Sequence, residues 1–334
     1  MRKILGIMLL VLVLLLAGGI TFTIGWRPFF GPRMRATTNR TFDRTPERAA
    51  RRKYLFEAAA GCVDCHSPHD WSQPGAPVSP AHFGIGAPAL PSDLPGKVFA
   101  PNLTPDPETG LGRWTDDEIA RAIREGVDRD GRALFPFMPY PHYRRMSDED
   151  VASVVVYLRE LPPVHNAVPQ TEMDFPVKYL MRSDPEPITA PVPPPDTSTP
   201  VSRGAYLVEI ASCSDCHTPQ HRGTPVPGMD FAGGFILKGN WGTVASANIT
   251  PDPTGISYYD ENLFRDVMRT GFVHARKLNI IMPWQTYGGM TDQDLSDMFA
   301  YLKTLKPVAH RVDNTEPPTY CKKCGFVHGL GDKN

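Results

Sequence analysis

Two five-residue segments of the chain share one pattern of cysteine and histidine. They are residues 62–66 (CVDCH) and 213–217 (CSDCH). In a Cys-x-x-Cys-His segment, two thiols can add across the vinyl groups of a porphyrin while the adjacent imidazole binds the iron. A single copy would also suit half of a zinc site or a redox dithiol. Because two copies occur in the same local context, we predict two covalently bound heme c groups, held by Cys62, Cys65, Cys213 and Cys216.

The sequences around these two motifs are also alike. Residues 54–57 (YLFE) precede the first motif and residues 206–209 (YLVE) precede the second. Downstream, each motif is followed by an Asn-x-Thr-Pro-Asp-Pro segment and then by a Met-Pro-aromatic segment. The offset between equivalent residues falls from 151 between Cys62 and Cys213 to 144 between Met138 and Met282. The chain therefore contains an internal duplication whose insertions lie between the motifs.

Helix-start signals recur in both copies. A Ser, Thr or Asp that can cap a helix precedes an acidic first turn at several places, which predicts helices that begin near residues 45–47, 115–118, 147–150, 257–260 and 291–294. Glycine or proline then marks where these helices end, at Gly61, Gly126, Pro162, Gly271 and Pro307. We expect a mainly α chain in which strands are few and proline stiffens the loops.

The N-terminus carries a targeting signal or a membrane anchor. Arg2 and Lys3 precede an uncharged stretch from Ile4 to Trp26, which is long enough to cross a bilayer core about 30 Å thick. A cleaved secretory signal usually has a shorter apolar core and a small-residue cleavage site, so we favour a retained transmembrane helix. Arg2 and Lys3 would stay inside and the rest would be exported. The expected location is the bacterial inner membrane, with the heme-binding part on the periplasmic side.

The iron ligands decide whether a heme carries electrons or binds substrate. We expect His66 and His217 to be the proximal ligands. For the distal ligands we choose Met138 and Met282, because both lie in an extended, proline-containing loop between two helices. Met146 stands at a helix start and is better explained by packing. Two His/Met hemes would leave no open coordination position, which favours an electron carrier over an enzyme.

Four further residues are predicted to form the heme environment. Asn102 and Asn248 each begin an Asn-x-Thr sequence, which formally allows glycosylation, but their repetition favours an ordered turn. Trp114 and Tyr258 follow these turns and could donate hydrogen bonds to heme propionates. Ordinary packing against the porphyrin edge explains Trp114 and Tyr258 equally well.

These motifs resemble the diheme and triheme cytochrome c family that includes the cytochrome subunits of membrane-bound alcohol and gluconate dehydrogenases. The resemblance runs from Tyr54 to Val308. It implies a heme-binding electron-transfer protein at the outer face of a bacterial inner membrane. The expected fold is an N-terminal transmembrane helix followed by two tandem class I-like cytochrome c domains. The expected parts are an anchor (1–26), a stalk (27–44), domain 1 (45–166), a Pro-rich linker (167–200), domain 2 (201–310) and a C-terminal tail (311–334).

The tail differs from that of the triheme subunits. It contains Cys321 and Cys324, but no histidine directly follows Cys324 and only ten residues remain, so a third heme is not expected. In an oxidising compartment the two thiols could form a local disulfide, which is the simpler interpretation. The alternative is a metal knuckle with His328 as a third ligand. The sequence shows no fourth ligand, which a partner chain would then supply.

We therefore predict a membrane-anchored diheme cytochrome c that relays electrons between a quinol-linked complex or dehydrogenase and a terminal acceptor. Its partners would be redox proteins, either a membrane oxidoreductase complex or a soluble cytochrome. The net charge of −1 gives no reason to expect a nucleic-acid partner. The alternative is a diheme redox enzyme of the peroxidase or thiosulfate-oxidising type, with one open or unusual heme site.

Overall fold

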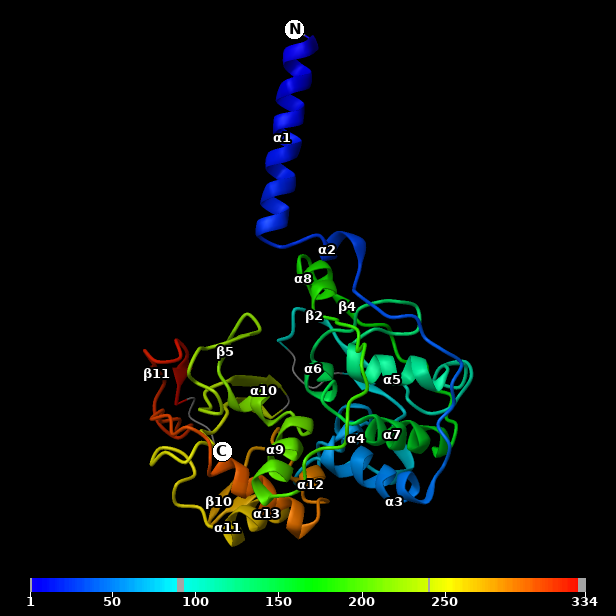
Figure 1. The fold of residues 1–334 in the computed structure, drawn as a ribbon. Helices are drawn as coiled ribbons and strands as arrows, with labels where there is room; N and C mark the ends of the chain where they lie inside the picture. The colour runs from blue at the N-terminus through cyan, green and yellow to red at the C-terminus, as the bar shows by residue number, and fades with distance from the viewer. Residues whose placement is uncertain (1, 89–92, 240, 330–334) are drawn as a thin grey trace.

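A single long helix projects from the body of the protein (Figure 1). The computed structural model describes residues 2–88, 93–239 and 241–329; the last residues of the predicted tail, 330–334, lie outside the described residues. Helix α1 (Arg2–Phe22) has no buried residue and no acidic residue in its first turn. It is the one helix among the described residues that is long and apolar enough to cross a membrane, a property that signal sequences share. Its composition matches the predicted anchor.

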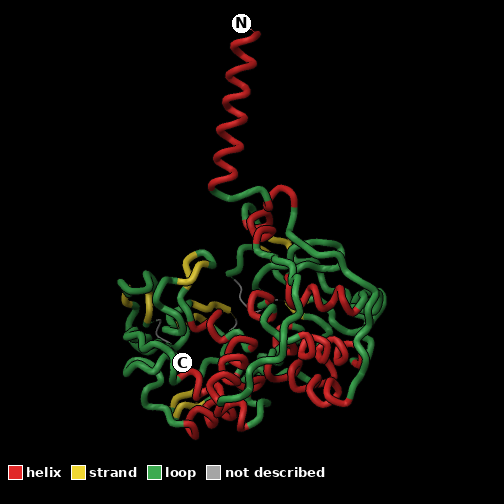
Figure 2. The backbone as a smooth tube through the Cα atoms, in the orientation of Figure 1, coloured by secondary structure: helices red, strands yellow, loops and turns green. Residues whose placement is uncertain are grey.

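Most of the remaining structure consists of short helices joined by long loops, as Figure 2 shows. We call residues 45–166 the first half and residues 201–310 the second half. The helical segments of the first half are α3 (Pro46–Tyr54), the π-turn η1 (Leu55–Ala59), α4 (Cys62–Cys65), the 3₁₀ turn η2 (Pro80–His82), α5 (Asp116–Glu125), α6 (Tyr140–Tyr143) and α7 (Asp148–Glu160). Those of the second half are α9 (Pro200–Ile210), α10 (Cys213–His217), α11 (Glu261–Thr270), α12 (Trp284–Tyr287) and α13 (Asp292–Leu302).

The helices begin where the capping residues predicted. The hydroxyl of Thr115 accepts a hydrogen bond from the backbone N–H of Glu118, whose carboxylate accepts one from the backbone N–H of Thr115. This reciprocal pair is a capping box, which satisfies two N–H groups that the first helical turn leaves free. Thr45, Ser147, Asp260 and Thr291 cap α3, α7, α11 and α13 through their side-chain oxygens.

The strand content is small, as expected, because each strand has only two to four residues. Six antiparallel two-stranded pairs occur in the described residues: β1 (Ala87–Pro88) with β3 (Phe99–Ala100), β2 (Gly96–Lys97) with β4 (Glu172–Met173), β5 (Gln220–His221) with β6 (Thr224–Pro225), β7 (Ile236–Gly239) with β8 (Gly242–Ala245), β9 (Phe272–Val273) with β10 (Arg276–Lys277), and β11 (Thr319–Tyr320) with β12 (Val327–His328). Each pair stays a separate two-stranded sheet, and the pairs do not combine into a larger sheet.

Both halves contribute to one continuous apolar core. In the first half α3 packs on α7, and in the second half α9 packs on α13. Side chains such as Leu55 and Val155 from the first half and Ile210 and Leu295 from the second are completely buried in this core. Burial of such side chains stabilises each by roughly 1.5–3 kcal/mol relative to exposure, so the core also holds the halves together.

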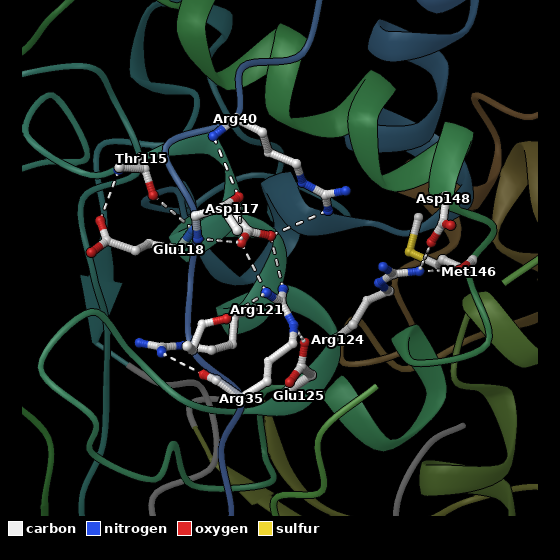
Figure 3. A network of polar contacts seen from close by, with 12 residues as sticks. Arg35, Arg40, Thr115, Asp117, Glu118, Arg121, Arg124, Glu125, Met146 and Asp148 are labelled. Carbon is white, nitrogen blue, oxygen red and sulfur yellow. Dashed lines mark hydrogen bonds and ion pairs between the residues drawn. The ribbon is translucent and has the colours of Figure 1, made fainter. Parts of the chain in front are cut away.

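The predicted stalk lies along the first half instead of standing free (Figure 3). Arg35 donates to Asp117 at 2.8 and 2.9 Å and to Glu125 at 2.7 Å, and the backbone N–H of Thr38 also donates to Asp117 at 2.8 Å. Burial alone would raise the pKa of Asp117, but the hydrogen bonds from Arg35 and Thr38 dominate and lower the pKa to about 2. The ion pairs therefore attach the chain after α1 to helix α5.

The segment between the halves contains more local structure than its proline content predicts. Besides β4 it forms α8 (Val177–Leu180) and the 3₁₀ turn η3 (Met181–Ser183). This part packs on α2 (Arg27–Phe30), the short helix after α1, and Arg182 donates to the carbonyl of Pro28 at 3.0 Å. Figure 1 shows α8 next to α2, below the end of α1. The middle of the predicted linker (residues 177–183) thus meets the beginning of the stalk.

Candidate functional site

His66 follows α4 directly and is held in one orientation. Its Nδ1 lies 2.9 Å from the backbone carbonyl oxygen of Pro101, and the residue is 7% exposed. Because a carbonyl oxygen can only accept, Nδ1 carries the proton and donates it, which leaves a lone pair on Nε2. Burial lowers the pKa of His66 and so favours the neutral imidazole. This is the state that a metal-ligating histidine requires.

His217 has the equivalent geometry in the second half. It is the last residue of α10, and its Nδ1 donates to the carbonyl of Ala247 at 2.7 Å. Burial lowers the pKa of His217 as well. The two histidines therefore present Nε2 in the same tautomer, from motifs 151 residues apart.

Asn102 and Asn248 hold the loops that provide these two carbonyl groups. Each asparagine is buried and stands directly after the accepting residue, Pro101 or Ala247. The Oδ1 of Asn102 accepts two hydrogen bonds from Thr104, and its Nδ2 donates to the carbonyl of Val164 at 2.8 Å. Asn248 forms the same bonds with Thr250 and with the carbonyl of Val308. The amides thus form an ordered turn that places the acceptor for the imidazole.

None of the four motif cysteines forms a disulfide bond. Cys62, Cys65 and Cys213 are partly buried and Cys216 is exposed. Burial raises the pKa of the Cys62 and Cys213 thiols to about 12. In each motif the residue before the first cysteine, Gly61 or Ser212, adopts a left-handed conformation and starts the short helix.

The two Met-Pro loops also match each other. The N–H of Tyr140 donates to the carbonyl of Met138 at 2.7 Å, and the N–H of Trp284 donates to the carbonyl of Met282 at 2.7 Å. Met138 and Met282 are both partly buried. Met146 is only 1% exposed within the apolar core, which agrees with a packing role.

Each loop contains a buried donor that lacks a hydrogen-bond partner among the described residues. These donors are the hydroxyl of Tyr140 and the indole Nε1 of Trp284. The ring of Tyr140 packs on Gly126 and that of Trp284 on Gly271, where a Cβ would come within about 2.5 Å of the ring. An unpaired buried donor is costly, so its position fits a cofactor that supplies an acceptor such as a propionate carboxylate.

Tyr140 and Trp284 were missed from the sequence. The signal that could have found them is their equal position, one residue after the proline of each Met-Pro pair. Of the two aromatic residues chosen instead, Trp114 is partly buried against the core, whereas Tyr258 is 58% exposed and contacts Tyr259 edge to face. The role of Trp114 and Tyr258 beside a heme stays a prediction.

Each motif helix contacts the other half of the chain. His142 of α6 contacts the second motif, with Nε2 2.7 Å from Asp215 and Nδ1 3.2 Å from Glu209. In the opposite direction, the hydroxyl of Thr286 in α12 donates to Asp64 of the first motif at 3.1 Å. Each Met-Pro loop is therefore followed by a helix that contacts the cysteine motif of the other half.

The tail residues gather beside the second half. The Sγ of Cys324 lies 3.1 Å from Nε2 of His328, and the Sγ of Cys321 lies 3.4 Å from Nε2 of His310. His310 was not foreseen as a neighbour, because its spacing from the cysteines matches no short motif.

The known proteins that are similar to this chain include dehydrogenase subunits and a diheme cytochrome c-type protein. The chain is 33% identical over 229 residues to one of the subunits of nicotinate dehydrogenase from Pseudomonas putida, a match that covers 64% of this chain and 17% of that protein. It is 31% identical over 307 residues to the cytochrome c subunit of a quinone-dependent alcohol dehydrogenase from Gluconacetobacter polyoxogenes, covering 80% of this chain and 62% of the relative. It is 32% identical over 213 residues to a diheme cytochrome c-type protein from Cereibacter sphaeroides, covering 61% and 67%.

The chain thus spans less than two thirds of the length of the two dehydrogenase subunits. The sequence model of the cytochrome c family matches residues 49–162 and again residues 201–306. Each matched region contains one Cys-x-x-Cys-His motif, one Asn-x-Thr turn and one Met-Pro loop. The protein therefore belongs to the cytochrome c family, with two regions of that fold in one chain, and heme c is its cofactor.

Proposed function

We propose that this protein is a membrane-anchored diheme cytochrome c, which relays electrons between a quinol-linked complex or dehydrogenase and a terminal acceptor. The observation that carries the proposal is the matched pair His66 and His217. The imidazole of His66 is buried and that of His217 is partly buried; both donate Nδ1–H to a backbone carbonyl and keep Nε2 available for iron.

The residues that would hold each cofactor come from the same parts of each half. Cys62 and Cys65 would attach the first heme and Cys213 and Cys216 the second, through thioether bonds. Each heme supplies an iron that takes up and releases one electron. Met138 and Met282 would close the distal side and exclude substrate and water from the iron. The unpaired donors of Tyr140 and Trp284 would then bind polar groups of the cofactor.

The interface between the halves supports transfer within one molecule. Contacts of His142 with Asp215 and of Thr286 with Asp64 hold each cysteine motif against the other half. The shared apolar core makes their separation constant. We propose that residues 45–166 and 201–310 act as two tandem domains with one fixed electron path between them.

We base the proposed location on helix α1 and the proposed partners on the relatives. We propose that α1 stays in the bacterial inner membrane and that both halves face the periplasm. Two of the relatives are named as dehydrogenase subunits. By analogy, this chain would accept electrons from a membrane oxidoreductase complex or dehydrogenase and pass them to a respiratory-chain complex or a soluble cytochrome.

The stoichiometry of covalent heme tests this proposal. We expect the pyridine hemochrome of the purified full-length protein to report two hemes per chain, and heme to persist on denaturing gels. Cys65→Ala and Cys216→Ala should each reduce the count to one. Carbon monoxide binding in stoichiometric amount to the unaltered, reduced protein would instead favour a diheme enzyme with an open iron.

A further inference from the structure

Four nitrogen and sulfur side chains converge beside the second half. They belong to His310, Cys321, Cys324 and His328, and their potential ligand atoms all lie within 4.8 Å of one another. Three of these residues are buried and Cys321 is partly buried. Two thiols and two imidazoles at such distances have the donor set and the spread of a tetrahedral Cys₂His₂ site.

The hairpin of β11 and β12 builds one side of the cluster. Thr319 pairs with His328 in this hairpin. Between the strands, the N–H of Cys321 donates to the carbonyl of Phe326 at 2.8 Å, and the N–H of Gly325 donates to the carbonyl of Cys321 at 2.9 Å. These bonds form a tight knuckle, which turns both thiols of the Cys-x-x-Cys segment toward the same point.

The two imidazoles are oriented by backbone carbonyls. Nδ1 of His310 donates to Ala232 at 2.8 Å, and Nδ1 of His328 lies 3.4 Å from the carbonyl of Arg311. Nε2 of each ring therefore faces a cysteine sulfur, at 3.4 Å for His310 and 3.1 Å for His328. Outer hydrogen bonds of this kind hold metal-ligating histidines in the correct tautomer.

Comparison with the equivalent residue of the first half shows which additional contact His310 makes. Its counterpart is Asn166: the N–H of Asn166 donates to Thr109 at 2.9 Å and its Nδ2 donates to the carbonyl of Ile85 at 2.7 Å. His310 forms both bonds in the second half, from its N–H to Thr254 at 2.9 Å and from Nδ1 to Ala232. An asparagine is thus sufficient for the loop, and the histidine has one further nitrogen that faces the cysteines.

From this geometry we propose that His310, Cys321, Cys324 and His328 bind one zinc ion. Two thiolates balance the charge of Zn²⁺, so the buried site is neutral once the thiols have released two protons to solvent. A disulfide between Cys321 and Cys324 would involve only the two sulfur atoms. It would leave Nε2 of His310 and Nε2 of His328 without a common metal ion to bind. The ion joins the tail to the second half.

The site also supports the loop behind His217. The carbonyl of His310 accepts a hydrogen bond from Nδ2 of Asn248 at 3.2 Å. Asn248 stands next to Ala247, the acceptor for His217. Zinc would therefore stabilise the surroundings of the second motif without taking part in electron transfer, because Zn²⁺ has no accessible second oxidation state.

Metal analysis of the full-length protein tests the proposal. We expect one zinc per chain in protein purified without added metal. His310→Asn keeps the bonds that Asn166 makes and should lower the affinity for zinc at least about 10-fold, while the heme spectrum stays unchanged. Cys324→Ser should lose zinc as well. His221→Ala is the matched control, because His221 stacks on Phe326 at 4.5 Å but is not a ligand, and it should keep its zinc.

Thiol titration separates the metal site from a disulfide. In denaturant with a chelator and no reductant, we expect Cys321 and Cys324 to react as two thiols per chain. Absence of both thiols until a reductant is added would overturn the proposal in favour of the disulfide. Zinc-edge absorption should show two sulfur ligands at about 2.3 Å and two nitrogen ligands at about 2.0–2.1 Å. Oxygen ligands alone would identify adventitious zinc and also overturn it. These outcomes do not depend on the proposed electron transfer.

Discussion

The hydroxyl of Tyr206 in the second half lies 2.5 Å from Oδ2 of Asp150 in the first half. The opposite contact also exists, because the hydroxyl of Tyr54 in the first half donates to Asp294 in the second. Asp150 additionally pairs with Arg51, and Asp294 with Arg203. The duplicated residues thus join the halves through reciprocal contacts, as in a two-fold arrangement.

Removal of one of these hydroxyls should weaken the interface. We expect Tyr206→Phe to reduce the free energy of unfolding by about 1–3 kcal/mol, since Asp150 is buried and loses a hydrogen bond to its charged group. Tyr54→Phe should have a similar effect through Asp294. Thermal unfolding followed by circular dichroism measures the change, and Tyr179→Phe is the control because that ring is exposed. Equal melting temperatures for Tyr206→Phe and Tyr179→Phe would exclude a role of this bond in stability.

The contact of His142 with the second motif predicts a dependence on pH. Burial alone would lower the pKa of His142, but the hydrogen bonds to Asp215 and Glu209 outweigh it and raise the pKa to about 9. The imidazolium form is therefore bound more favourably in the folded than in the unfolded protein. Its contribution to stability is complete below about pH 6.5, as long as the carboxylates are ionised, and is lost as the pH rises through about 9.

His142→Ala should accordingly be less stable than the unaltered protein at pH 6, and this difference should shrink by pH 10. Melting temperatures across this range provide the measurement. His165→Ala, at a side chain that is 64% exposed, serves as the control and should follow the unaltered protein. Curves for His142→Ala that run parallel to the unaltered protein from pH 6 to 10 would contradict the raised pKa.

The proposed axial methionines predict separate effects on the two hemes. Met138→His should lower the reduction potential of the first heme and leave that of the second nearly unchanged, because the ligand loops belong to different halves. Met282→Ala should open the second iron to carbon monoxide. Potentiometric titration followed by optical spectroscopy measures the potentials. Met146→Leu, in the core, should change neither potential. A shift of both hemes in Met138→His would mean that the assignment is wrong.

The N-terminal helix α1 leads us to predict that the protein is found with the membranes and not in the soluble fraction. If α1 is retained, the mature protein starts at or near Met1, sediments with membranes and resists extraction by salt or carbonate. Deletion of residues 4–26 behind a cleavable signal should release a soluble diheme protein with the same spectrum, because Arg35 still attaches the stalk to Asp117 and Glu125. A mature terminus beyond Gly18 in the soluble periplasm would instead identify α1 as a signal peptide.

Several features of this protein could be predicted from residues that lie close together in the sequence. The cysteine motifs, the duplication and the helix starts at Thr115, Ser147 and Thr291 could be predicted because capping and motif chemistry act within about five residues. Membership of the cytochrome c family follows from the same repeated segments. The ordered turns of Asn102 and Asn248 were also foreseen, since each asparagine bonds a threonine two residues ahead.

Contacts between residues far apart in the sequence were decided only by the tertiary structure. Tyr54 and Asp294 are 240 residues apart, and no local pattern says that their halves pack against each other. His310 joins Cys321 and Cys324 because the β11–β12 hairpin folds back onto a loop of the second half, a placement set by packing and by the carbonyl of Ala232. Arg35 likewise binds Asp117 because the chain after α1 runs along α5. Such contacts depend on the shapes and charges of whole surfaces, which a linear pattern does not contain.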